Sequence, residues 1–220
     1  LVHGRNGNRA DEDIGLPEIA KALVERGYNV LAFDLRGHGE SAGDRLSFGP
    51  WETGDLLGAV DYLKLQGISP RRIGVLGFSM GAATALLAAA ESGDIRAVVA
   101  DSSYASVVEL IEREFPKASG LPGFFVPGAI LMGRLLLGID VGAAAPEMVM
   151  AKVAPRPVLL IHGLEDSFVP PAHAERLRQV AGPTAQLWLV PGAEHVGAFR
   201  VDPTGYLGRV VSFFDDALLD

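Results

Sequence analysis

Short, continuously apolar runs alternate with longer amphipathic segments along most of this chain, and this alternation restricts the possible fold more than any other feature. A strand buried on both faces of a parallel sheet has an unbroken apolar sequence, whereas a strand with one wet face alternates apolar and polar residues. The runs here are unbroken and so predict a parallel sheet. The predicted strands are residues 29–34, 72–78, 95–100, 157–162 and 185–190, and residues 1–2 resemble the end of another strand.

The segments between these runs have the spacing of helices. In residues 51–66, apolar side chains recur every three or four positions and so share one face, and Gly67 follows as a stop signal. Helices that connect parallel strands make right-handed crossovers, so the order predicts an α/β fold, a mostly parallel central sheet with helices on both faces. The predicted helices are residues 16–26, 51–66, 80–91, 106–115, 171–180 and about 203–219.

The rhythm of strands and helices breaks once, between about residues 116 and 155. This stretch is rich in apolar residues but has no strand pattern, and a bare loop of such length would be unusual. We therefore expect a short helical cap insertion that lies over one end of the sheet. The length of 220 residues suits a single domain, residues 1–220, that carries this insertion.

Composition excludes several kinds of site and partner. The chain has 19 basic and 27 acidic side chains and a formal net charge of −8, whereas nucleic acid or an anionic membrane surface requires a cationic face. The absence of cysteine excludes disulfides, thiol nucleophiles and cysteine-ligated zinc. We therefore expect no nucleic-acid partner and no zinc site built from cysteines.

One stretch has the length of a membrane span. Residues 73–90 carry no charge over 18 positions, which reaches the lower limit for a transmembrane helix. Their first half is strand-like and their second half is a strong helix former, so a strand running into a buried helix is the better interpretation. No signal peptide or membrane anchor is visible, and a cytoplasmic location is expected; the start at Leu1 suggests a processed or truncated N-terminus.

Gly77-Phe78-Ser79-Met80-Gly81 has the pattern Gly-x-Ser-x-Gly and lies between a predicted strand and a predicted helix. At so sharp a turn the serine takes a strained backbone conformation that exposes its hydroxyl, and the glycines let strand and helix approach closely. The turn also brings the Met80 N–H to the positive end of the helix, where it can donate to a developing oxyanion. The bare pattern occurs by chance in loops, so the strand-turn-helix context is what identifies Ser79 as a candidate nucleophile.

A serine nucleophile needs a base, and the chain offers five histidines. His195 follows the last predicted strand, in a loop that a sheet of this order presents beside Ser79, so it is the candidate base. A structural role suits the other four better, because three lie in turns after strands and His173 is expected to be solvated in the first turn of a helix. The four are His3, His38, His162 and His173.

The base in turn needs an ionised carboxylate that accepts a hydrogen bond from the imidazole and stabilises the imidazolium. Asp166 follows the penultimate predicted strand, at the same edge of the sheet, and is the candidate acid. Glu165 is expected to face away, and Asp101, after an earlier strand, is expected to brace the loop beneath the site. The chain order Ser79, Asp166, His195 is the order that this architecture requires.

Five motifs stand in order along the chain: His3-Gly4, Asp34-Leu-Arg-Gly-His-Gly-Glu-Ser41, Gly77-Phe-Ser-Met-Gly81, His162-Gly-Leu-Glu-Asp166 and Gly192-Ala-Glu-His195. Together they resemble the α/β-hydrolase superfamily over nearly the whole chain. Within it, the sequence looks like bacterial serine hydrolases related to the prolyl-oligopeptidase-like and serine-aminopeptidase-like groups. The stretch 138–153 is similar to the small cap that precedes the acid-bearing strand in these groups.

This resemblance implies that the residue after His3-Gly4 donates its backbone N–H to the oxyanion hole, together with Met80. That residue is Arg5, and the alternative is a surface arginine with no catalytic part. The family also has leading strands before this turn, whereas only two residues precede it here. The leading strands are therefore expected to be missing from this chain, although every proposed catalytic residue is present.

The expected activity is two-step acyl transfer, without cofactor or metal, in which Ser79 attacks a carbonyl carbon and His195 moves the proton. The expected substrate is a small-molecule carboxylic ester with a small to medium acyl chain. Apolar residues of the insertion would line its pocket, unless they merely pack on the body of the protein. These residues are Phe124, Phe125, Val126, Ile130, Leu131 and Leu135.

Two other functional classes remain open. A peptidase acting on peptide N-termini needs a carboxylate pair for the substrate ammonium, and the nearby acidic cluster is Glu109, Glu112 and Glu114. Their helical spacing is more typical of a solvated face. A non-catalytic binding protein on a hydrolase fold is the third class, and it would require a triad that has decayed.

Overall fold

The computed structural model describes residues 1–219 and contains a parallel sheet of four strands in the order β1-β2-β3-β4. In register, Phe78 of β1 faces Asp101 of β2, and Gly163 of β3 faces Val190 of β4. Parallel strands that are consecutive in the sheet and in the chain need a crossover between each pair, and helices supply it. The strands are β1 (Gly74–Phe78), β2 (Ala97–Asp101), β3 (Val158–Gly163) and β4 (Ala185–Val190).

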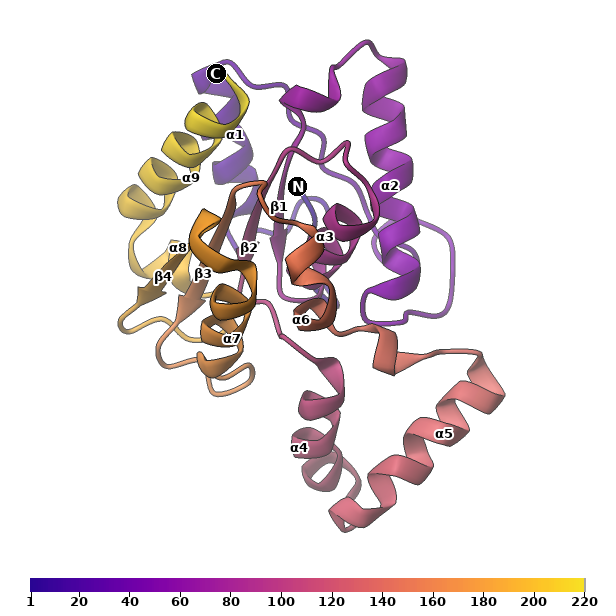
Figure 1. The fold of residues 1–220 in the computed structure, drawn as a ribbon. Helices are drawn as coiled ribbons and strands as arrows, with labels where there is room; N and C mark the ends of the chain where they lie inside the picture. The colour runs from indigo at the N-terminus through magenta and orange to yellow at the C-terminus, as the bar shows by residue number, and fades with distance from the viewer. Residues whose placement is uncertain (220) are drawn as a thin grey trace.

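Helices cover both faces of the sheet, so the predicted α/β fold is confirmed (Figure 1). One apolar core lies between the sheet and α1 (Leu16–Arg26) and α9 (Pro203–Leu218). The other lies between the sheet and α2 (Pro50–Leu65), α3 (Met80–Glu91) and α7 (Ala172–Ala181). Successive strand residues point to opposite faces, which is why these strands are apolar without a break.

The uncharged run of residues 73–90 is divided between β1 and α3, as the sequence predicts. Almost every residue of α3 is buried, and its alanines allow it to pack closely against the sheet. Within residues 1–219, the structure has no helix with the length and apolarity needed to cross a membrane.

The predicted strand at residues 29–34 is wrong. Phe33 forms a single bridge with Val2, and Val2 in turn bridges Gly77 at the edge of β1. The Val2 N–H donates to the Leu76 carbonyl (2.9 Å), and the Phe78 N–H donates to the Val2 carbonyl (3.0 Å). Only Leu1 and Val2 lie between the 29–34 segment and β1, and two residues are too short for a ladder of strand hydrogen bonds.

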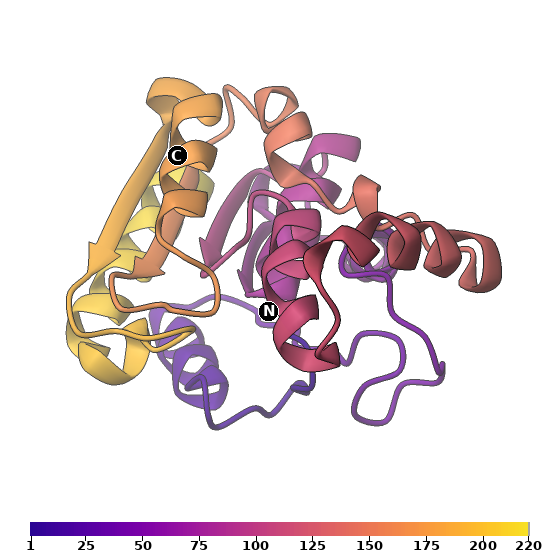
Figure 2. The same cartoon turned by 90° about the horizontal axis from the view of Figure 1, so that it is seen from below.

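The predicted insertion is helical but only its first part projects from the body. α4 (Val107–Ser119) continues past its predicted end at residue 115, with Pro116 inside it, and ends at Gly120, whose φ is 72°. α4 leads away from the sheet, and η2 (Gly123–Phe125) and α5 (Val126–Leu137) then lie outside the body of the protein (Figures 1 and 2). η3 (Val141–Ala143), α6 (Pro146–Val149) and η4 (Met150–Lys152) return to the body, where Met150 is fully buried.

The remaining short elements are η1 (Pro70–Arg72), η5 (Gly182–Thr184) and α8 (Ala198–Val201). α8 follows the loop after β4, the loop that contains His195, and it packs against α9. Since parallel strands all end at one edge, the loops after β1, β2, β3 and β4 meet there.

Candidate active site

Ser79 lies at the turn from β1 into α3 with φ 51° and ψ −114°, a conformation that non-glycine residues rarely adopt. Its N–H donates to the carbonyl of Asp101 on β2 (2.8 Å). A Cβ at Gly77 would overlap the backbone of Gly81, and a Cβ at Gly81 would overlap the carbonyls of Val2 and His3. Both glycines are therefore required for the close approach of β1, α3 and the first residues of the chain.

The structure brings Ser79, His195 and Asp166 into one hydrogen-bonded line. His195 Nε2 lies 2.8 Å from Ser79 Oγ, and His195 Nδ1 lies 2.7 Å from Asp166 Oδ2. A carboxylate only accepts hydrogen bonds, so Nδ1 carries the proton and Nε2 is free to accept the Ser79 hydroxyl. The Asp166 side chain is fully buried and the His195 side chain is 22% exposed, so solvent reaches the imidazole but not the carboxylate.

Asp166 is held as a carboxylate by its surroundings. Its Oδ1 accepts the N–H groups of Phe168 (3.0 Å) and Val169 (2.7 Å), while Oδ2 faces His195. Burial by itself would raise the pKa of Asp166, but hydrogen bonds from His162 and His195 outweigh it and lower the pKa to about 2. Asp166 is therefore ionised at any pH at which a serine nucleophile would work.

The two predicted oxyanion donors are the backbone N–H groups of Met80 and Arg5. Met80 is the first residue of α3, and Arg5 follows Gly4, whose added Cβ would lie 3.4 Å from the Cβ of Ser79. Within residues 1–219, neither the Met80 N–H nor the Arg5 N–H donates to an acceptor. The Arg5 side chain points elsewhere, with its guanidinium 5.6 Å from the centre of the Phe48 ring. The arrangement leaves both N–H groups available for an oxyanion.

The other four histidines each bond to the backbone. His3 donates from Nδ1 to the Gly4 carbonyl (2.7 Å) and accepts the Leu35 N–H at Nε2 (3.0 Å). His38 bonds to the Arg36 carbonyl, and His162 to the Val169 carbonyl. His173 is not solvated as expected from its place in the first turn of α7. Its side chain is buried because the loop after β2 packs over it, and its Nδ1 accepts the Ala105 N–H (3.3 Å).

The two competing carboxylates do not contact His195. Glu165 is exposed and faces away. Asp101 is fully buried and accepts hydrogen bonds from Ser102 and from Tyr206, both 2.9 Å. Burial raises the pKa of Asp101 to about 6. Of the three carboxylates that the sequence offers as the acid, Asp166 is the one that bonds to His195.

The structure does not bring the predicted pocket residues to the triad. They lie on η2 and α5, whose neighbours are each other and α4. Phe124 is 75% exposed and stacks on Phe125, with ring centres 4.4 Å apart. Phe125 and Leu131 are also exposed, Ile130 is half-buried, and Leu135 is exposed, whereas Val126, the first residue of α5, is buried. We call the projecting segment formed by η2 and α5, residues 123–137, the arm.

One aromatic residue that the sequence analysis missed, Phe168, lies beside the triad, and another, Phe48, lies against the Arg5 side chain. The Phe168 ring stands edge-on to the His195 ring, with centres 5.1 Å apart, and is 43% exposed. Phe48 lies under Arg5, and its carbonyl accepts the Tyr104 hydroxyl. Phe168 follows Asp166 by two positions in the loop after β3. This short distance along the chain from the predicted acid is the sequence signal that could have identified Phe168 as a neighbour of the site.

The acidic cluster considered for a peptidase is largely occupied. Glu109 forms a two-bond ion pair with Arg176 on α7 (2.8 and 2.9 Å). Glu114 bonds to Arg113 and Lys117, and these bonds lower its pKa. Glu112 is exposed. Among residues 1–219, no group of three or more metal-ligating side chains lies close enough together to hold a metal ion.

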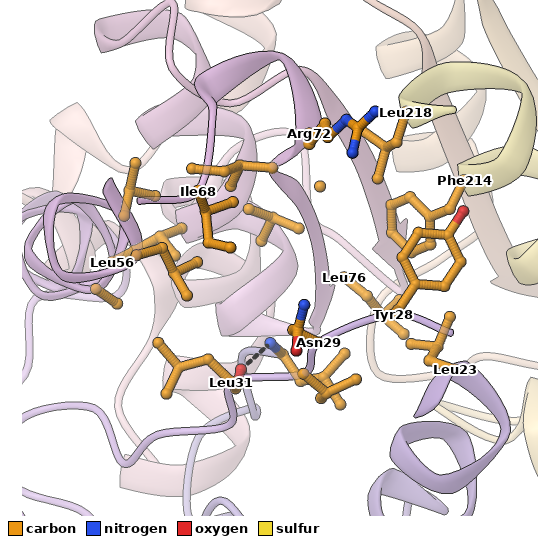
Figure 3. Close-up of a pocket in the computed structure, with 18 of the residues that line it drawn as sticks. Leu23, Tyr28, Asn29, Leu31, Leu56, Ile68, Arg72, Leu76, Phe214 and Leu218 are labelled. Atoms are coloured by element: carbon orange, nitrogen blue, oxygen red, sulfur yellow. Dashed lines mark hydrogen bonds between the residues drawn. The ribbon is translucent and has the colours of Figure 1, made fainter. Parts of the chain in front are cut away.

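An apolar cavity of about 240 Å³ lies at the opposite end of β1 from Ser79 (Figure 3). Leu23, Tyr28, Leu56 and Phe214 line it, together with the first residues of β1. The amine of Leu1 bonds there to the Leu31 carbonyl (2.7 Å). None of the triad residues lines this cavity, so it is separate from the candidate active site.

Comparison with known proteins supports the fold. A family model described as alpha/beta hydrolase fold matches residues 1–125. The uncharacterized protein YfhR of Escherichia coli O157:H7 is 33% identical over 99% of this chain and 70% of its own length. The uncharacterized protein YqkD of Bacillus subtilis is 32% identical over 88% of this chain and 64% of its own length.

The solved structure of the esterase Pf2001 from Pyrococcus furiosus is similar over 99% of this chain and 81% of that chain. The TM-score is 0.79 at 28% sequence identity. The parallel sheet with helices on both faces, the serine at the strand-to-helix turn and the family model all agree. This chain belongs to the α/β hydrolase fold family.

Proposed function

We propose that this protein is a serine esterase that cleaves carboxylic esters of small to medium acyl chains through an acyl-enzyme on Ser79. The observation that carries the proposal is the line of hydrogen bonds from Asp166 through His195 to Ser79, with distances of 2.7 and 2.8 Å. A nucleophile within reach of a base, and a base oriented by a third group, are what acyl transfer requires. The similar protein from Pyrococcus furiosus is described as an esterase, which supports this reaction class.

In the first step, His195 Nε2 takes the proton of the Ser79 hydroxyl as Oγ bonds to the ester carbonyl carbon. The carbonyl oxygen becomes an oxyanion, and the Met80 and Arg5 N–H groups donate to it. Asp166 stabilises the imidazolium, which then gives its proton to the leaving alkoxide as the ester bond breaks. In the second step, His195 takes a proton from water, water attacks the acyl-enzyme, and Ser79 leaves with the proton returned.

The choice of ester over peptide depends on charge around Ser79. A substrate ammonium needs unpaired carboxylates, and Glu109 and Glu114 are both engaged with basic side chains. Phe168 offers apolar surface beside His195 instead, which suits an uncharged ester. No observation favours a peptidase.

Hydrolysis of p-nitrophenyl esters from acetyl to decanoyl, beside aminoacyl anilides, tests the proposal. We expect turnover of esters with highest kcat/KM among the shorter chains, and labelling of the protein by a fluorophosphonate probe. Ser79→Ala should abolish both, while Ser119→Ala, which changes an exposed serine at the end of α4, should abolish neither. Preference for anilides would favour a peptidase, and absence of labelling would favour a non-catalytic binding protein.

A further inference from the structure

Asp101 is a buried carboxylate that the proposed mechanism does not use. It ends β2, the strand between the one that leads to Ser79 and the one that leads to Asp166. Its carbonyl accepts the Ser79 N–H (2.8 Å), and its side chain accepts the hydroxyls of Ser102 and Tyr206 (both 2.9 Å). An ionisable group is costly to bury, so a carboxylate held between two hydroxyls under the active site calls for a reason.

Ser102 connects this carboxylate to the base. Its hydroxyl donates to Asp101 Oδ1, which leaves the lone pairs of Oγ to accept, and Oγ accepts the N–H of Val196 (3.0 Å). This N–H belongs to the peptide bond that follows His195. The Ser102 N–H is itself fixed by the Ile161 carbonyl of β3 (2.9 Å). The Ser102 hydroxyl thus ties the His195–Val196 peptide to the end of β2, while the Glu165 N–H ties the same loop at the Ala193 carbonyl (3.0 Å).

The backbone at both ends of this contact is strained. Ser102 has φ 55° and Val196 has φ 51°. A positive φ is rare for any residue with a side chain, and rarer for a β-branched one such as valine. Such a conformation persists only where surrounding contacts hold it, and strain of this kind collects at active sites.

We propose that Asp101 and Ser102 are positioning residues that hold the His195–Val196 peptide and so set the distance from His195 Nε2 to Ser79 Oγ. Asp101 orients the Ser102 hydroxyl, and Ser102 holds the loop. Neither touches the reacting atoms. This inference rests on the proposed esterase function for its kinetic test, and on the Val196 hydrogen bond alone for its structural test.

The kinetic test compares Ser102→Ala with Ser103→Ala. Both serines are buried neighbours, but Ser103 donates to the Tyr104 carbonyl (3.1 Å) and does not contact the His195 loop. A displacement of about 1 Å at a catalytic group can cost about 100-fold in rate. We expect Ser102→Ala to lower kcat and the rate of fluorophosphonate labelling by about 10- to 100-fold with KM unchanged, and Ser103→Ala to change each by less than about threefold.

Ser102→Gly distinguishes the effect of losing the hydroxyl from the effect of backbone strain. It removes the hydroxyl as Ser102→Ala does, but glycine adopts φ 55° without strain. If the hydroxyl positions His195, the glycine variant is as slow as the alanine variant; recovery of the rate in glycine would overturn the proposal. Near-ultraviolet circular dichroism at the assay temperature verifies that each variant is folded. Equal labelling rates in folded Ser102→Ala and Ser103→Ala would also overturn it.

Amide hydrogen exchange at Val196 tests the contact independently of any activity. We expect this N–H to be protected in the unaltered protein and in Ser103→Ala, and to exchange at least about tenfold faster in Ser102→Ala, because its acceptor is gone. Unchanged protection would overturn the inference. If instead the unaltered protein is not labelled at Ser79, the proposed function fails, and the exchange result still decides whether Ser102 holds the loop.

Discussion

His195 Nε2 lies 2.8 Å from Ser79 Oγ although the two residues are 116 positions apart in the chain. The sheet explains this proximity. β3 and β4 are neighbours and carry Asp166 and His195 in the loops at their carboxyl ends, while Ser79 follows β1, two strands away from β3. The loop after β4 therefore carries the base across the ends of β3 and β2 to meet the serine. Any change that shifts the carboxyl ends of these strands relative to one another should alter catalysis before it alters the fold.

Asp166→Asn should lower kcat/KM by about 1,000-fold or more, through the tautomer of His195. Oδ1 of Asp166 accepts two backbone N–H groups, so the amide nitrogen of asparagine has to take the position of Oδ2 and face His195 Nδ1. An N–H there forces Nδ1 to accept and puts the proton on Nε2, which can no longer take the Ser79 proton. Steady-state hydrolysis of a p-nitrophenyl ester measures the loss.

Glu165→Gln is the matched control for this variant. It makes the same chemical change one position earlier, on an exposed side chain. We expect kcat/KM within about twofold of the unaltered protein, as for most surface substitutions. Comparable losses in the two variants would contradict the assignment of Asp166 as the acid.

Phe168→Ala should raise KM for short-chain esters by about fivefold, because the ring covers the edge of His195 and offers its exposed part to substrate. Loss of roughly 1 kcal/mol of apolar contact corresponds to this factor. Phe124→Ala removes an equal ring from the projecting arm, and we expect KM to change by less than about twofold. A larger effect of Phe124→Ala would mean that the acyl group lies against the arm, as the sequence analysis expected.

Elements with strong local signals could be predicted from the sequence. The α3 helix and β4 agree with their predicted bounds to the residue, because an alanine-rich run and a compact apolar run each allow one interpretation. The turn at Ser79 has its own local signal, two glycines around a serine. Asp166 and His195 follow predicted strands at one edge of a parallel sheet. The order of the strands is therefore enough to predict both residues, without any distance between atoms.

Features that depend on a partner could not be predicted. The apolar run at residues 29–34 has the composition of a strand, yet a strand requires a neighbour to pair with. Within residues 1–219 the pairing of this run is a single bridge between Phe33 and Val2. Phe124 and Phe125 are apolar whether they line a pocket or project into solvent, so their sequence cannot distinguish the two. The exposed position of the arm depends on the direction and length of α4, which carries the chain away from the body. Proline usually ends a helix, but α4 continues past Pro116 to Ser119, so the sequence does not predict this length.

Gly81→Ala should destabilise the protein by about 2 kcal/mol or more, since its Cβ would overlap two backbone carbonyls that cannot move as a side chain can. These carbonyls belong to Val2 and His3, so the turn that carries Arg5 should shift as well, and labelling of Ser79 should slow. Chemical denaturation followed by circular dichroism measures the first effect.

Gly58→Ala, in the middle of α2, is the opposite case. Nothing lies within 4 Å of an added Cβ there, and alanine favours a helix over glycine by about 1 kcal/mol. We expect this variant to be more stable by that amount and to keep full labelling. A stable, fully labelled Gly81→Ala would show that the close approach of α3 to the first residues is not needed.

His173 should make the protein less stable in mild acid. Burial, followed by the nearby Arg176 guanidinium, lowers the pKa of His173 to about 4, and its Nδ1 is committed as an acceptor from Ala105 and Arg176. The unfolded chain, in which this histidine has a pKa near 6.5, therefore binds the proton first as pH falls. The contribution is complete above about pH 6.5 and is lost between there and about pH 4, with a size of about 3 kcal/mol at most.

Replacing His173 by glutamine removes this titration. The free energy of unfolding, measured by chemical denaturation from pH 8 to pH 4.5, should fall more steeply for the unaltered protein than for His173→Gln. Asp101 titrates in the same range with the opposite sign, because its raised pKa of about 6 costs stability as pH rises from about 4, but it is present in both proteins and cancels in their difference. Parallel curves would mean that His173 has the same pKa in the folded protein as in the unfolded chain, and that its bonds to Ala105 and Arg176 do not persist in solution.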